Sequence, residues 1–245
     1  MPRVQETVVW TRGGSSSTVL SVTVGWDGIR DRLERLRIEY ARGRADAVFG
    51  ANGHHFEVLP PLGDGDVAEA EARFGVRLPE DYRGFLTAVS AGGAGPYYGL
   101  FPLGRDAAGR WCWQGDGAEL TDVTALGTSF DPGDISGALA RLRAIQPSVD
   151  AEDAYQGWLN RYEDVLWDDR RTHGAVCLCH EGCAYRDWLI VAGPLRGQMW
   201  DDERAGDVDL APSRANDGRT LAFGHWYLNW LNEAERTVFK TRHHS

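Results

Sequence analysis

Three of the four cysteines lie in the seven-residue segment 177–183, which reads CLCHEGC. Thiolates and imidazoles are the usual ligands of zinc, and closely spaced cysteines also carry out thiol–disulfide chemistry. The residues concerned are Cys177, Cys179 and Cys183, with His180 between them. The segment therefore has three possible roles: a metal site, a redox site, or a structural role in which the thiols pack inside a core.

The spacing of these residues favours the structural role. Alternate side chains of a β-strand share a face, so Cys177 and Cys179 are expected on one face and His180 on the other. Structural zinc sites usually combine two short ligand pairs from separate parts of the chain. Here there is one such cluster, and His173 would have to fold back to complete it. We therefore expect no metal and no cofactor, with a zinc-dependent enzyme built on Cys177, Cys179 and Cys183 as an open alternative.

Other catalytic patterns are absent from the sequence. It contains no G-x-S-x-G, no Walker A and no H-E-x-x-H motif. The adjacent acids Asp168-Asp169 and Asp201-Asp202 would face opposite ways in a strand, which argues against a joint catalytic role for either pair. We therefore expect a protein that is not an enzyme and has no catalytic residues.

The net charge of −10 is unevenly distributed along the chain. Residues 1–115 carry a balance of −1 and residues 116–245 a balance of −9. An acidic half argues against direct nucleic-acid binding and favours a basic protein partner. The sequence has no apolar run long enough for a transmembrane helix and no secretion signal, and its clustered cysteines do not resemble a disulfide framework. We expect a cytoplasmic protein that does not bind membranes.

Hydrophobic periodicity predicts an α+β fold in a single domain, with a mainly antiparallel, curved sheet packed against several helices. The aromatic stripes place Trp158, Trp226 and Trp230 in the core, whereas His54 and His55 are expected in an exposed loop. Helices are predicted over 27–41, 66–74, 135–145, 151–167 and 223–239, with a further one that begins at Pro79. Consecutive strands are predicted over 174–180, 187–193 and 197–202, because their separators have hairpin length.

Several blocks of the sequence then resemble one known family, the SUKH superfamily, which includes bacterial toxin-immunity proteins and fungal regulators of cell-wall assembly. The first block is 71–103, with its G-V-R-L-P entry, D-Y-R, F-L, paired glycines and G-L. The others are the small-residue turn at 182–184, the strands D-W-L-I-V and G-Q-M-W-D, and the closing aromatic helix 223–231. The likeness covers about 60–103 and 174–235. It departs from the family pattern at Ala91 and Ala184, where Asn and Gly are usual.

The resemblance implies a protein-binding module that neutralises a cognate toxin domain, with a SUKH-like domain over 27–245. Residues 1–26 form an extension of uncertain structure, and 104–173 form a poorly matched insert. A regulatory or scaffold domain that binds an endogenous protein is the second possibility. The toxin could be basic and nuclease-like, because an acidic surface would cover a phosphate-binding site.

Two groups of residues are the candidates for contact with this partner. Tyr97 and Tyr98 lie in a Gly/Pro-rich turn, where aromatic side chains are expected at the surface. The second group is an aromatic residue followed by acids, a combination that suits a binding hot spot for a basic protein. It comprises Trp200, Asp201, Asp202 and Glu203.

Overall fold

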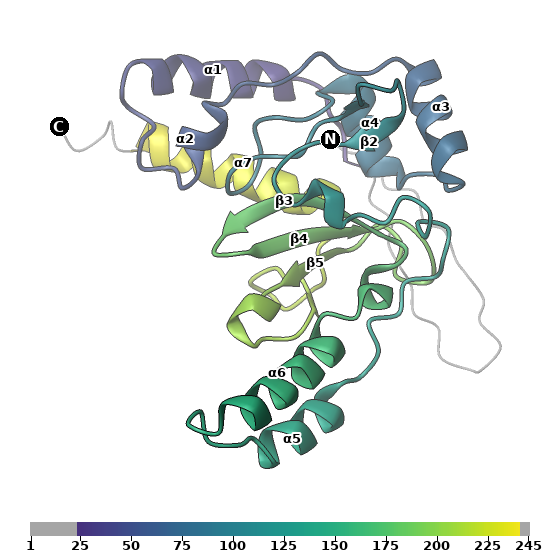
Figure 1. Ribbon diagram of the computed structural model, residues 1–245. Helices are drawn as coiled ribbons and strands as arrows, with labels where there is room; N and C mark the ends of the chain where they lie inside the picture. Colours follow the sequence, from purple (N-terminus) through teal and green to yellow (C-terminus); the bar gives the residue numbers. More distant parts are fainter. Residues whose placement is uncertain (1–23, 241–245) are drawn as a thin grey trace.

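Seven α-helices and two antiparallel sheets build the computed structural model, which describes residues 24–240. The predicted α+β class is confirmed. Figure 1 shows α1 (Ile29–Ala41) beside α7 (Phe223–Lys240) on one side of the larger sheet. The hairpin of α5 (Ser136–Ala144) and α6 (Glu152–Leu166) extends from the other side. No helix in the described part of the chain is long and apolar enough to cross a membrane.

The helices of the N-terminal half form where the apolar stripes predict them. In α1, the apolar residues Ile29, Leu33 and Leu36 are buried. α3 (Asp64–Phe74) is followed by Gly75 as its C-cap. The φ of Gly75 is 66°, the left-handed conformation that a helix C-terminus often needs and that glycine adopts without strain. α4 (Glu80–Ala88) begins one residue later than predicted, because Pro79 is its N-cap and not its first helical residue.

Two features of this half differ from the sequence prediction. Most of the predicted N-terminal extension, residues 1–23, lies outside the described residues, but Val24 and Trp26 pack into the main core. His54 is the last residue of the short helix α2 (Ala51–His54), and its side chain is buried rather than exposed in a loop. The imidazole packs edge-on against the ring of Trp230. This aromatic contact favours a buried position of the His54 side chain.

The three predicted strands are confirmed as consecutive antiparallel neighbours, and a short fourth strand follows them. Their order in the sheet is β3 (Ala175–Gly182), β4 (Tyr185–Ile190), β5 (Met199–Asp202) and β6 (Ala211–Pro212). The remaining elements are the hairpin of β1 (Leu103–Arg105) and β2 (Trp111–Trp113) and the 3₁₀ helices η1 (Ala118–Leu120), η2 (Asp169–Thr172) and η3 (Arg204–Gly206).

The closing helix α7 packs against α4 through aromatic contacts. The ring of Phe85 on α4 lies 5.5 Å from that of Phe223 and 4.7 Å from that of Tyr227. Trp226 is buried as predicted, whereas Trp230 is only half-buried. This difference leaves one face of α7 open to a cleft described below.

The α5–α6 hairpin, which lies in the predicted insert, has a hydrophobic cluster of its own. Its buried residues are Leu139, Trp158, Tyr162 and Leu166, so Trp158 packs in this cluster and not in the main core. Two buried arginines hold the end of α6 against the sheet: Arg171 Nη1 and Arg204 Nη1 both donate to the Leu166 carbonyl, at 3.3 and 3.1 Å. Cations at a helix C-terminus also offset the helix dipole.

Candidate functional site

The register of the first two strands separates the cysteines. Cys177 is opposite Trp188 and Cys179 is opposite Asp187, so β3 advances by two residues while β4 advances by one. This β-bulge interrupts the strict alternation of side chains. Trp188 and Asp187 are successive residues of β4 and point to opposite faces, and the two thiols therefore do so as well. The expectation that Cys177 and Cys179 share a face is wrong.

The other members of the cluster lie elsewhere. Cys183 is exposed in the two-residue turn between β3 and β4, where it and Ala184 have φ values of 50° and 67°. Two positive φ values are typical of a type I′ hairpin turn, which here lacks the usual Asn or Gly. His180 stacks on Tyr98, with ring centroids 4.8 Å apart. Across residues 24–240, no three His, Cys, Asp or Glu side chains are grouped so that they could hold a metal ion.

The predicted acidic surface is divided between the two faces of the sheet. Trp200 is 8% exposed, and its ring packs against that of Phe130 at 5.0 Å. Asp202 is 2% exposed, accepts a hydrogen bond from Trp188 Nε1 at 3.0 Å and forms an ion pair with Arg204 at 2.7 Å. The expectation that Trp200 and Asp202 lie at the surface is wrong, because the strand turns both toward a covered face.

On the opposite face, buried polar groups lie side by side across three strands. Cys179, Asp187 and Asp201 are direct cross-strand neighbours. The Cys179 thiol donates to Asp187 Oδ2 at 3.1 Å, and the Ser213 hydroxyl donates to Asp201 Oδ1. Asp187 is 0% exposed, and no donor from residues 24–240 reaches its Oδ1. A buried carboxylate oxygen without a donor is costly, which favours a proton on this group.

Burial and mutual repulsion raise the pKa of each of these acids. Burial raises the pKa of Asp187 well above its ordinary value, and the Glu181 carboxylate raises it further. Burial also raises the pKa of Glu181 and of Asp201. Asp187 and Asp201 lie directly opposite each other on neighbouring strands, so ionisation of one disfavours ionisation of the other. We call Glu181, Asp187 and Asp201 the carboxyl cluster.

Tyr97 connects the carboxyl cluster to the solvent side of the molecule. Its side chain lies beside Glu181, and burial together with the charges of Asp187 and Glu181 raises the pKa of its hydroxyl. The backbone of Tyr97 has a φ of 52°, an uncommon conformation for a residue other than glycine and one often found at functional sites. A Cβ on Gly50 would lie 1.8 Å from the Tyr97 carbonyl oxygen, so only glycine allows this close approach.

Tyr97 also lines a cleft of about 780 Å³ beside α7. Aromatic rings dominate its apolar lining, and Phe49 at its rim is 63% exposed. The arginines of the cleft bind other groups: Arg236 pairs with Glu233, and Arg214 donates to the Gly218 carbonyl. The other aromatic residues of the lining are Tyr97, Trp226 and Trp230.

Three of the six candidate residues share one electrostatic environment. Asp201 lies close enough to Tyr97 to raise its pKa, and Glu203 raises the pKa of Asp201 and Glu181. Tyr98 lies against His180 and Phe49. Trp200 and Asp202 belong to the other face of the sheet. The part of the predicted surface that remains is smaller. It extends from the loop at Tyr97 to the strand at Asp201.

Sequence reasoning missed Glu181, Asp187 and Phe49. Asp187 carried a usable signal, because it is a charged residue at the start of an otherwise apolar strand (DWLIV) and must either be paired or be neutral. Glu181 was read only as part of the cysteine segment. Phe49 lies in a loop with no periodic pattern, and nothing in the sequence brings it near Tyr97.

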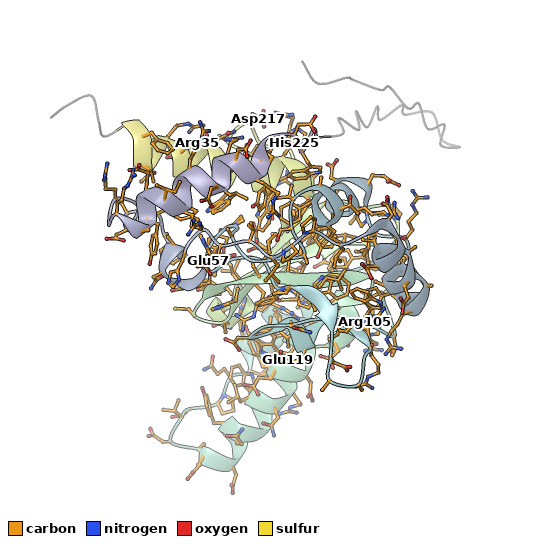
Figure 2. All side chains as sticks on the ribbon, turned by 90° about the horizontal axis from the view of Figure 1, so that it is seen from above. Arg35, Glu57, Arg105, Glu119, Asp217 and His225 are labelled. Atoms are coloured by element: carbon orange, nitrogen blue, oxygen red, sulfur yellow. The ribbon has the colours of Figure 1, made fainter. Side chains whose placement is uncertain are left out.

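Ion pairs occur at many separate places on the described part of the chain. Figure 2 shows the labelled side chains of Arg35, Glu57, Arg105, Glu119 and Asp217 spread over separate parts of the view. Arg35 pairs with Glu235, and Arg105 pairs with Glu69. The members of the carboxyl cluster take no part in these ion pairs.

Comparisons with family models, with curated proteins and with solved structures found no match. The SUKH resemblance therefore stays a prediction from the residues that carry it.

Proposed function

We propose that this chain is a non-enzymatic, cytoplasmic binding protein of the SUKH type, which neutralises a toxin domain by covering its active surface. The order of elements supports the proposal: an entry at Pro79 into a helix, a glycine-rich turn, a run of antiparallel strands and a closing aromatic helix. These are the elements that the resemblance implies. Fold likeness alone does not establish a function, so the proposal needs a site.

The observation that carries the proposal is a group of accessible aromatic rings beside carboxyls that lack an arginine partner. Phe49 lies 6.3 Å from Tyr97 and 5.7 Å from Tyr98 by ring centroids. Tyr97 in turn contacts Glu181 of the carboxyl cluster. Aromatic anchors next to unpaired acids suit a basic protein surface, such as the phosphate-binding face of a nuclease.

Features of the cysteine segment support a role without catalysis. Burial raises the pKa of both the Cys177 and the Cys179 thiol, and a protonated, buried thiol is a poor nucleophile and a poor metal ligand. The register also directs these two thiols to opposite faces. A zinc-dependent enzyme would need Cys177, Cys179 and Cys183 to converge on one ion.

The test begins with capture of the partner from the protein's own cells with a tagged chain, followed by identification of the bound protein. The captured protein is then expressed alone in a host, and growth is measured with and without this chain. We expect a toxic partner and growth restored by co-expression. A captured protein that does not affect growth would instead favour the regulatory alternative, and no stoichiometric partner would sink the proposal.

A further inference from the structure

Elsewhere in the described part of the chain, three buried or largely buried acids have an arginine beside them. Glu39 pairs with Arg42 and Arg44, and Glu71 pairs with Arg83 at 3.0 Å. Asp202 pairs with Arg204 in the same way. Such pairing is what burial of a charge normally requires.

The carboxyl cluster breaks this pattern. Within residues 24–240, no arginine, lysine or histidine nitrogen lies within 4.0 Å of a carboxylate oxygen of Glu181, Asp187 or Asp201. Asp187 is 0% exposed with an Oδ1 that no donor satisfies, and it is directly opposite Asp201. The site thus has acceptors and negative charge without a cation from the chain itself.

The cluster is open on one side. Glu181 and Asp201 are half-buried, so these two residues are partly accessible to solvent, whereas Asp187 is wholly buried. Tyr97 is half-buried as well and interacts with Glu181. An incoming group would therefore meet two carboxyls and an aromatic side chain together.

We propose that Glu181 and Asp201, with Tyr97 beside them, form a receptor for an arginine side chain that the basic protein partner inserts. A guanidinium offers a planar fork of donors that two carboxylates can share, and its face packs well on an aromatic ring. It would supply the cation that the fold supplies to Asp202 through Arg204. The inference rests on the proposed function, because it names the chemical group through which the partner is recognised.

The experiment measures binding of a fluorescent hexa-arginine peptide with blocked termini to the full chain, at low and at physiological salt. We expect the wild-type chain to bind it and the Asp201→Asn and Glu181→Gln variants to bind it roughly tenfold or more weakly, as the loss of a charge-assisted hydrogen bond implies. The matched control is Asp164→Asn, which removes one exposed charge from α6 and should leave binding within about twofold.

Several outcomes would overturn the inference: no peptide binding by the wild-type chain, equal weakening by Asp164→Asn, or equal affinity for spermidine, which would indicate a receptor for small cations. Thermal melts show whether each variant is folded, and the two variants of the cluster test the same site independently. Once the partner is known, its affinity for the same variants separates the two proposals. A partner that binds all variants equally well contradicts the arginine receptor alone, whereas the lack of any partner contradicts the proposed function.

Discussion

Asp201 and Asp202 are adjacent in β5, but only Asp202 has a counter-ion beside it. Asp202 lies on the covered face of the sheet, where Arg204 and the Trp188 indole satisfy both of its oxygens. Asp201 lies on the opposite face, where its neighbours are Asp187 and the Ser213 hydroxyl. One face provides its acid with a counter-ion, and the other brings acids together without one.

The difference separates a structural acid from an acid that is available for recognition. The Asp202–Arg204 pair also fixes the end of α6, because Arg204 donates to the Leu166 carbonyl and packs over the Trp167 ring at 4.7 Å. It therefore links the α5–α6 hairpin to the sheet. The carboxyl cluster serves no comparable link between elements, and its repulsion makes the folded state less stable than paired acids would.

The largest effect is expected where the counter-ion of the covered face is removed. Arg204→Ala leaves the Asp202 charge buried and the Leu166 carbonyl without one of its donors, so it should lower the free energy of unfolding by about 3–5 kcal/mol. Urea denaturation measures the change. The control is Arg219→Ala, which breaks the exposed pair with Asp217 and should cost at most about 1 kcal/mol. Equal effects of the two variants would contradict a structural role for the buried pair.

The next largest effect is expected when an aspartate is replaced by asparagine on each face of the sheet. Asp202→Asn leaves Arg204 buried without its counter-ion and should cost roughly 2–4 kcal/mol. Asp187→Asn replaces a carboxyl whose burial favours the protonated form with an amide of the same shape, and it should change stability by less than about 1 kcal/mol. Denaturation of both variants at neutral pH tests the contrast. A larger loss in Asp187→Asn would mean that Asp187 carries a charge that the fold needs.

The pH dependence of stability sharpens the comparison. The pKa values of Glu181, Asp187 and Asp201 are raised in the folded protein, so above their unfolded-state values the folded chain holds more protons than the unfolded chain. Stability from these groups is complete below the unfolded-state pKa values, near pH 4, and is lost as the pH rises through the higher folded-state values. The Cys179 thiol and the Tyr97 hydroxyl face the same acids and stay protonated over this range, because their pKa values are also raised.

We therefore expect wild-type stability to decline between mildly acidic and mildly alkaline pH, and this decline to be smaller in Asp187→Asn. His54 contributes a slope of opposite sign at lower pH, since burial lowers its pKa to about 4. Measurements of unfolding free energy above pH 6.5 keep the two contributions apart. A wild-type chain whose stability rises with pH over that range would contradict the raised pKa values of the cluster.

The sequence was sufficient to predict six of the seven described helices and the three main strands, but not the face to which each strand directs its acids. Periodicity predicts α6 and α7, because long amphipathic stripes depend on local spacing alone. The β-bulge at Leu178 has no sequence signal, and it reverses the relation between Cys177 and Cys179. The separation of Asp201 from Asp202 depends on strand register, and a shift of one residue exchanges the two faces. Three candidate residues were therefore found in the right strand, β5, but two of them, Trp200 and Asp202, were assigned to the wrong face.

The smallest expected effect isolates a single contact on each face. Cys177 and Cys179 are both completely buried, but only the Cys179 thiol donates to a carboxyl, at 3.1 Å from Asp187 Oδ2. Substitution by alanine removes the same atoms at both positions, and each variant should lose roughly 1 kcal/mol from the small cavity. A thiol is a weak donor, so the loss of unfolding free energy in Cys179→Ala should exceed that in Cys177→Ala by only about 0.5 kcal/mol. A double-mutant cycle with Asp187→Asn measures this coupling directly. The stability loss caused by Cys179→Ala should be smaller in the Asp187→Asn background, whereas the loss caused by Cys177→Ala should be the same in both backgrounds. Equal coupling of both cysteines to Asp187 would contradict the register that directs them to opposite faces.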